Sequence, residues 1–261
     1  MDNNLKIDWS SYFDRIWCIN YIPYKSRRDA ISKEFDRIGI SDHPNFMWHY
    51  TFDSPFYGMG FEVLKANPQL GRMLNPTELK CWAAHYSCIK KSLAFGDGRI
   101  LIIEDDSRFL KDVSEMQSIL DSMPEDGDVI LFDHFANVGG EEYGSYKERK
   151  VNDFYSEYDN LDSCGCYSLS RAAMVAFELL YERIVIPADN YTSKIPLPLL
   201  KKCFSLKNLS CQATYAKSMS VNNAGTDTIH RVYRKSGIDY SEYNMDDGRP
   251  YGYGSYILEN D

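Results

Sequence analysis

The fold is decided by residues 99–106, which read Arg99-Ile100-Leu101-Ile102-Ile103-Glu104-Asp105-Asp106. The aliphatic run in this stretch is uninterrupted, which is typical of a strand covered on both faces of a sheet. The run stops abruptly at three carboxylates. In open α/β sheets, ligands bind beyond the carboxyl ends of the strands. The stretch therefore predicts a buried central strand that ends at a ligand site.

A long helix is expected directly before this strand. Asn75 and Pro76 are suited to the N-cap and first helical positions, and Gly96 is suited to ending the helix. The apolar residues between them recur at helical spacing on one face, which predicts an amphipathic helix. They are Leu79, Trp82, Tyr86, Ile89 and Leu93.

Strand and helix signals alternate along the rest of the chain. We expect strands at residues 15–22, 45–52, 128–132 and 166–169, and helices at about residues 26–38, 113–123 and 171–183. Residues 134–152 are expected to be loop, and residues 184–232 show only short apolar pieces. The alternation predicts an α/β fold with a mixed, mostly parallel sheet and helices on both faces. We expect one domain over residues 12–232 and a Tyr- and Gly-rich extension over residues 233–261.

Composition excludes some classes of protein. The chain has 261 residues with 44 % hydrophobic content, which is enough for a sizeable core, and a formal net charge of −9. That charge argues against a general nucleic-acid binder, whose affinity depends on neutralising phosphates. The polar first residues and the absence of a long apolar run predict a soluble, cytoplasmic protein. Cys164-Gly165-Cys166 lacks the spacing of a zinc motif, so the seven cysteines are expected to be reduced thiols.

The three carboxylates after the aliphatic run repel one another. Strand alternation would place Glu104 and Asp106 on one side and Asp105 on the other. Each close pair costs about a few kcal/mol at an intermediate dielectric constant. Mg²⁺ or Mn²⁺ would remove that cost, because both ions prefer oxygen ligands and accept phosphates in their remaining positions. The alternative is a solvated acidic junction. Asp133, which follows another predicted strand, is interpreted as a loop cap.

Two arginines open the first predicted helix. Arg27 and Arg28 lie in its first turn, where an anion on the exposed amides would offset their unfavourable interaction with the helix dipole. Asn20, at the end of the preceding strand, would face the same crevice. A phosphate site is one interpretation. The other is a solvated pair near Asp29 and Glu34.

Several of these segments resemble glycosyltransferase family 25, the lipooligosaccharide-type galactosyltransferases. The resemblance covers residues 16–20 with Arg27 and Arg28, residues 74–85, 102–106, 165–173 and 186–189, and loosely 220–230. At Ala84 the family's pattern has a serine, so that hydroxyl is missing here. The resemblance implies a GT-A-like, Rossmann-type fold, a nucleotide-sugar donor such as UDP-galactose, and inversion at the anomeric carbon.

The resemblance also implies roles for single residues. Donor-binding residues would be Asn20, Arg27, Arg28, His85, Glu104 and Asp105. Metal ligands for Mn²⁺ or Mg²⁺ would be Glu104, Asp106 and His230. Asp189 would be the catalytic base. By itself, His85 is interpreted as a structural histidine beside the apolar stripe; with the resemblance, it is expected to fix the acidic segment by hydrogen bonding.

The sequence thus predicts transfer of a hexose, galactose from UDP-galactose, to a saccharide or lipid-linked saccharide acceptor such as a lipooligosaccharide. Lys201, Lys202 and Lys207 could bring the protein to the inner face of an anionic membrane. One alternative is a nucleotidyltransferase that makes sugar nucleotides, but residues 20–28 lack the glycines of its phosphate loop. Another is a non-catalytic protein that binds glycans or a partner on the same fold.

Overall fold

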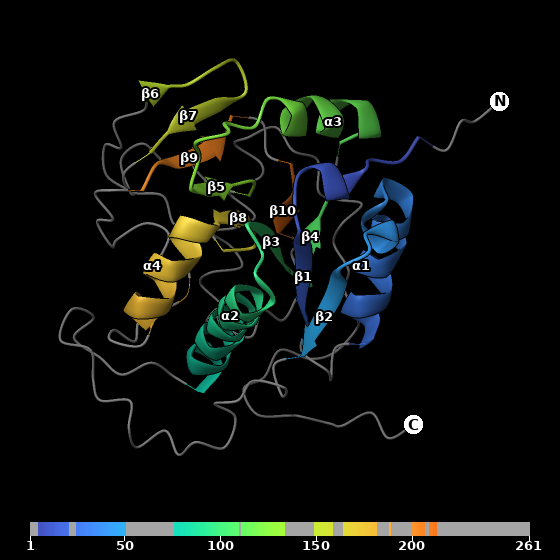
Figure 1. Cartoon of the computed structure of the whole chain (residues 1–261). Coiled ribbons are helices and arrows are strands. Elements are labelled where there is room, and N and C mark those ends of the chain that lie inside the picture. The colour runs from blue at the N-terminus through green and yellow to red at the C-terminus, as the bar shows by residue number, and fades with distance from the viewer. Residues whose placement is uncertain are drawn as a thin grey trace, which may run out of the picture.

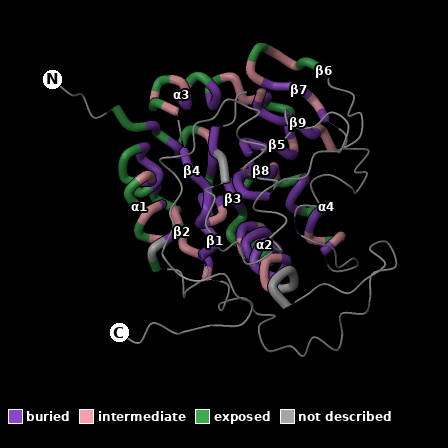
Figure 2. Tube along the Cα trace, turned by 180° about the vertical axis from the view of Figure 1, so that it is seen from behind, coloured by how far each residue is buried: buried purple, intermediate pink, exposed green. Residues whose placement is uncertain are grey.

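The structure is a computed structural model. It describes residues 5–20, 25–50, 76–109, 111–133, 149–158, 164–181, 188, 200–206 and 209–212. These residues form an eight-stranded sheet with helices on both faces (Figure 1). Figure 2 shows the central strands of the sheet buried, whereas the two edge strands are partly or fully exposed. The predicted α/β class is confirmed.

The sheet is mixed, with the strand order β2-β1-β3-β8-β5-β9-β7-β6. β1 pairs in parallel with β2 and β3, and β5 pairs in parallel with β9. β8 and β7 run opposite to the other strands. The strands are β1 (Arg15–Asn20), β2 (Phe46–Tyr50), β3 (Arg99–Glu104), β5 (Val129–Leu131), β6 (Arg149–Lys150), β7 (Tyr155–Glu157), β8 (Cys166–Ser170) and β9 (Lys202–Ser205). A separate pair joins β4 (Ser107–Arg108) to β10 (Cys211–Gln212).

Both faces of the sheet are covered by helices. α2 (Pro76–Phe95) and α4 (Arg171–Tyr181) pack on one face, where Ile100 and Ile102 contribute to the core. The opposite core contains Leu101 and Ile103 together with side chains of the elements on that face. Those elements are α1 (Lys25–Ile38), α3 (Val113–Asp121) and the short helices η1 (Trp9–Ser11) and η2 (Ile40–Asp42). The predicted burial of β3 from both sides is therefore confirmed.

The helix ends follow from local sequence. Gly39 and Gly96, directly after α1 and α2, adopt φ values of 91° and 85°, a left-handed conformation that glycine reaches without steric cost. Ser170 caps α4, because its hydroxyl accepts a hydrogen bond from the Ala173 amide at 3.2 Å. Asp112 caps α3 in the same way, through the Glu115 amide at 2.7 Å. These caps fix the registers of the helices on the sheet.

Some elements were not predicted. β7 and β9 are short strands whose burial depends on pairing, since β9 pairs with both β5 and β7. β6 lies within residues 134–152, which we expected to be loop. Ile7 and Trp9, which precede residue 12, are buried in the core. The expected domain boundary near residue 232 and the extension over residues 233–261 lie outside the described residues. Among the described residues, no helix is long and apolar enough to cross a membrane.

Candidate functional site

The carboxyl ends of β1 and β3 meet at one edge of the sheet. The two strands are neighbouring and parallel, with Ile19 paired to Glu104 in register. Asn20, the last residue of β1, donates its side-chain amide to Asp105 Oδ2 at 2.6 Å. Asn20 Oδ1 is buried and has no hydrogen-bond partner within the described part of the chain. Asn20, which was expected to face the crevice of Arg27 and Arg28, thus contacts the acidic segment.

Arg27 holds the two aspartates. Its Nη1 donates to Asp105 Oδ1 at 3.0 Å and its Nη2 donates to Asp106 Oδ2 at 2.6 Å, and all three side chains are buried. The prediction that Glu104 and Asp106 share one side by strand alternation was wrong. β3 ends at Glu104, so Asp105 and Asp106 lie in a turn and both reach the same guanidinium.

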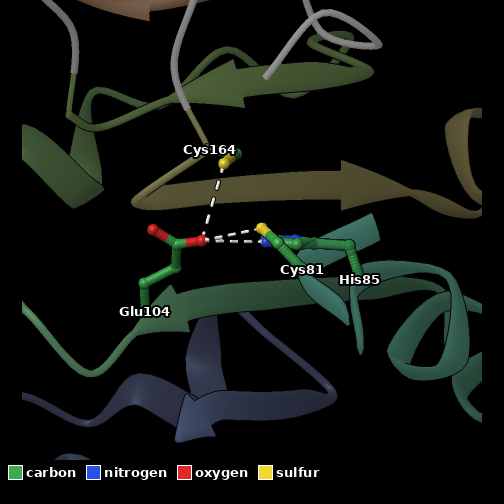
Figure 3. Close-up of side chains that lie close together, drawn as sticks. All are labelled: Cys81, His85, Glu104 and Cys164. Carbon is green, nitrogen blue, oxygen red and sulfur yellow. Dashed lines mark hydrogen bonds and ion pairs between the residues drawn. The ribbon is translucent and has the colours of Figure 1, made fainter. Parts of the chain in front are cut away.

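Glu104 contacts a different set of side chains (Figure 3). Its Oε1 lies 3.1 Å from His85 Nε2, 3.5 Å from Cys81 Sγ and 3.7 Å from Cys164 Sγ. The other carboxylate oxygen points away from these three residues. The hydrogen bond expected from His85 to the acidic segment is thus present.

His85 and Glu104 each stabilise the charged form of the other. Burial lowers the pKa of His85, but interactions with Cys81 and hydrogen bonding and attraction by Glu104 outweigh burial and raise the pKa to about 10. Burial raises the pKa of Glu104, but hydrogen bonding and attraction by His85 bring it below its usual value. In the absence of a metal ion, Glu104 is a carboxylate that is held by an imidazolium.

Asp133, which follows the end of β5 by two residues, belongs to the same group of acids. It is buried, and its Oδ1 has no hydrogen-bond partner among the described residues. Burial raises the pKa of Asp133 well above its usual range, and the charges of Asp106 and Glu104 raise it further. A Cβ on Gly165 would lie 2.6 Å from Asp133 Oδ2, so glycine is needed there. From the sequence, we interpreted Asp133 as a loop cap. The feature that could have indicated a site residue is the position of this acid just beyond a buried strand.

The group of acids suits a divalent cation. Glu104, Asp106 and Asp133 interact electrostatically, and the unpartnered oxygen of Asp133 is a buried acceptor. Carboxylate oxygens are the preferred ligands of Mg²⁺ and Mn²⁺. Arg108 stiffens the turn, since its Nη1 donates to the carbonyls of Asp105 and Ser107 at 3.3 and 2.6 Å. The oxygen donors of these side chains are therefore of the kind that a metal of this class prefers.

Of the remaining predicted site residues, the structure describes Arg28 but not Asp189 or His230. Arg28 is half-buried in the first turn of α1. Asp189 and His230 lie outside the described residues. Of the lysines expected near a membrane, Lys201 pairs with Asp126 at 2.8 Å, Lys202 is buried beside Tyr158, and Lys207 lies outside the described residues.

The comparisons with known proteins give one sequence relative of interest. Over 98 residues, the chain is 30 % identical to a glycosyltransferase 25 family member from Anopheles gambiae, covering 36 % of this chain and 17 % of that protein. The chain thus spans a small part of the relative that it matches. No protein-family profile matches the chain.

Solved structures are similar only at a low level. They include a glycosyltransferase involved in glycosylation of the major capsid of PBCV-1, at 11 % identity, TM-score 0.35 and 64 % coverage of both chains. The inositol-1-phosphate CTP transferase from T. maritima has 12 % identity and a TM-score of 0.42, with 85 % of this chain and 97 % of that chain covered. A UDP-glucose pyrophosphorylase has 9 % identity and a TM-score of 0.41, with 85 % and 81 % covered. Similarities at this level do not indicate a function.

Proposed function

We propose that this protein is a glycosyltransferase that takes a sugar from a nucleotide-sugar donor. The observation that carries the proposal is the convergence of Asn20, Arg27 and the segment Glu104–Asp106 at the carboxyl ends of β1 and β3. This edge is where α/β sheets bind ligands. The local sequence match to a glycosyltransferase 25 family member supports the same class of reaction.

In the proposed donor site, the acidic residues and the arginines would have different roles. Glu104, Asp106 and Asp133 would hold Mn²⁺ or Mg²⁺, and when bound the metal supplies positive charge to the leaving diphosphate. Arg27 fixes Asp105 and Asp106 in position through its two hydrogen bonds. Arg28, exposed in part beside it, would contact a donor phosphate. His85 positions Glu104 through its 3.1 Å contact.

The transfer needs a base for the acceptor. In an inverting reaction, the acceptor oxygen attacks the anomeric carbon, the bond from that carbon to the diphosphate oxygen breaks, and the acceptor proton moves to the base. We assign the base to Asp189 by its place in the family pattern; His230 is proposed as a further metal or phosphate ligand on the same ground. Galactose from UDP-galactose is the proposed sugar, and a saccharide or lipid-linked saccharide is the proposed acceptor.

The experiment measures UDP release from a panel of UDP-sugars, including UDP-galactose, with and without Mn²⁺. We expect release that depends on the metal and is reduced at least about 100-fold in Glu104→Ala and Asp106→Ala, since both remove donor-site carboxylates. Asp126→Ala is the matched control, because the Asp126 carboxylate is exposed, pairs with Lys201 and does not belong to the segment Glu104–Asp106. Undiminished release in both site variants would contradict the assignment.

The same preparation separates the alternatives. A nucleotidyltransferase would consume UTP and a sugar 1-phosphate and release pyrophosphate, whereas the proposed enzyme would not. A non-catalytic binding protein would show heat of binding for a UDP-sugar in calorimetry without any release of UDP. Either result would replace the proposal.

A further inference from the structure

We propose that Cys81, His85, Glu104 and Cys164 form a binding site for a thiophilic divalent cation of the zinc class. Each residue offers one ligand atom, and the four atoms all lie within 4.8 Å of one another. Figure 3 shows the two sulfurs and the imidazole nitrogen turned toward one carboxylate oxygen. Two thiolates, an imidazole and a carboxylate are ligands that favour zinc over magnesium or manganese.

The distances between the four ligand atoms are close to those of a metal-bound ligand shell. A tetrahedral zinc site with Zn–S of about 2.3 Å and Zn–N or Zn–O of about 2.0–2.1 Å places its ligand atoms about 3.3–3.8 Å apart. From Glu104 Oε1, the distances of 3.5 and 3.7 Å to Cys81 and Cys164 fall within this range, and the distance of 3.1 Å to His85 lies just below it. The remaining pairs, at no more than 4.8 Å, would need to close by about 1 Å or less, which small side-chain rotations supply.

A second observation comes from the far side of the imidazole. His85 Nδ1 lies 2.8 Å from the Tyr167 hydroxyl, and the two buried rings stack with centroids 5.7 Å apart. Zinc-bound histidines typically engage the other ring nitrogen in such a hydrogen bond, which fixes the tautomer and the ring orientation. Here the contact leaves Nε2 facing Glu104 and both thiols.

The site joins three separate elements. Cys81 and His85 are four residues apart on α2, so both project from one face of the helix. Glu104 ends β3, and Cys164 lies in the segment just before β8. Cys166 does not take part, because it belongs to the core on the opposite face of the sheet. The Cys-x-Cys spacing is therefore irrelevant, and the ligands meet only through the fold.

A bound metal ion also explains the convergence of three side chains on Glu104 Oε1 better than hydrogen bonds alone do. Without it, two thiols, which are weak donors, and an imidazolium all point at Glu104 Oε1. Binding would displace the two thiol protons and the second imidazole proton to solvent, leaving two thiolates, a neutral imidazole and a carboxylate around the cation. Because the other oxygen of Glu104 points away, this site leaves it available to the donor site. The site shares Glu104 and His85 with the proposed donor site, but its occupancy is tested without any substrate.

The test titrates Co²⁺ into the full chain after removal of metal by a chelator under reducing conditions. We expect the visible bands of a tetrahedral cobalt ion, a near-ultraviolet thiolate-to-cobalt band, saturation at one equivalent, and complete displacement by Zn²⁺. These signals report ligands directly and need no substrate. Their absence, or a disulfide between Cys81 and Cys164 found by mass spectrometry before reduction, would overturn the proposal.

Variants locate the site within the chain. Cys81→Ser and Cys164→Ser should each weaken the thiolate band and reduce Zn²⁺ affinity at least about 100-fold. Tyr167→Phe removes one hydroxyl and preserves packing, and it should reduce Zn²⁺ affinity about 10- to 100-fold. Cys88→Ala is the matched control, since it removes another buried thiol of α2 that lies outside the cluster, and its spectrum should be unchanged. An unaltered spectrum in both serine variants, or unaltered affinity in Tyr167→Phe, would refute the assignment.

Discussion

His85 Nε2 lies 3.1 Å from Glu104 Oε1, although the two residues are 19 positions apart and belong to different elements. The imidazole comes from the middle of α2 and the carboxylate from the last position of β3. Cys81 and Cys164 contact the same oxygen. The orientation of the Glu104 side chain at the end of β3 is thus set in part by α2, a helix that covers the sheet.

The first prediction concerns this positioning role. His85→Gln keeps a polar side chain of similar reach but loses the ring contact with Tyr167. We expect the KM for the nucleotide sugar to rise about tenfold with a smaller change in kcat, because the donor site is misplaced and the reacting groups remain. Steady-state kinetics measures both values. A fall in kcat at constant KM would instead assign His85 to the chemical step.

The second prediction concerns Arg27. Arg27→Gln leaves Asp105 and Asp106 buried without their guanidinium, so the free energy of unfolding should fall by about 3–5 kcal/mol. Urea denaturation measures this loss. Arg28→Gln, in the same turn of α1 but half-exposed, is the control and should cost less than about 0.5 kcal/mol. Equal losses in the two variants would show that Arg27 acts through the helix and not through the aspartates.

The third prediction concerns Asp133. Its carboxyl is buried near Asp106 and Glu104, so ionisation there is unfavourable in the metal-free protein. Asp133→Asn should raise the free energy of unfolding near neutral pH by about 1 kcal/mol or more, because an acid whose ionisation is opposed by folding is replaced with a neutral amide, and it should weaken Mn²⁺ binding, because a carboxylate ligand is lost. Denaturation and calorimetry provide the two readouts. A variant that loses stability would show that the carboxylate has a structural partner.

The fourth prediction concerns Gly165. Gly165→Ala would bring a Cβ within 2.6 Å of Asp133 Oδ2, which should cost about 1–3 kcal/mol and displace the carboxylate. In an Asp133→Ala background the same substitution should cost less. Gly96→Ala serves as the comparison: no atom lies within 4 Å of its Cβ, but φ is 85°, so it should lose about 1 kcal/mol from backbone strain without affecting metal binding. A cost at Gly165 that is unchanged in the double variant would refute the contact.

The fifth prediction concerns His49, a buried residue of β2 beside Lys91. Burial, followed by the charges of Lys91 and His85, lowers the pKa of His49 to about 4 from 6.5. Between these values the unfolded chain binds the proton and the folded protein does not, so acidification favours unfolding. From pH 7.5 to pH 5, His49 should therefore remove about 2 kcal/mol of stability.

His49→Phe is the control for this pH effect, because it keeps an aromatic ring against Trp17 and cannot titrate. The difference in unfolding free energy between the two proteins, followed by urea denaturation across this pH range, isolates the histidine from all other groups. A constant difference would show that His49 has an unperturbed pKa.

Much of the scaffold could be predicted from local pattern. The aliphatic run of residues 100–103 predicted a strand buried on both faces, and the glycines after α1 and α2 predicted where those helices end. β9 could not be predicted in this way. Its four residues carry no clear period, and their burial arises from pairing with β5 and β7, which are distant in the chain.

The sequence by itself determined the α/β class, the principal helices and the placing of three acids at the end of a central strand, because periodicity and capping act between residues a few positions apart. Only the tertiary structure decided which groups meet at that edge. The turn after Glu104 directs Asp105 and Asp106 to Arg27, 78 and 79 residues away. Strand order brings Asp133 beside Gly165, and packing of α2 on the sheet brings Cys81 and His85 to Glu104 and Cys164. These contacts depend on strand order and on the exact end of a strand, and neither is encoded in any short stretch of the chain.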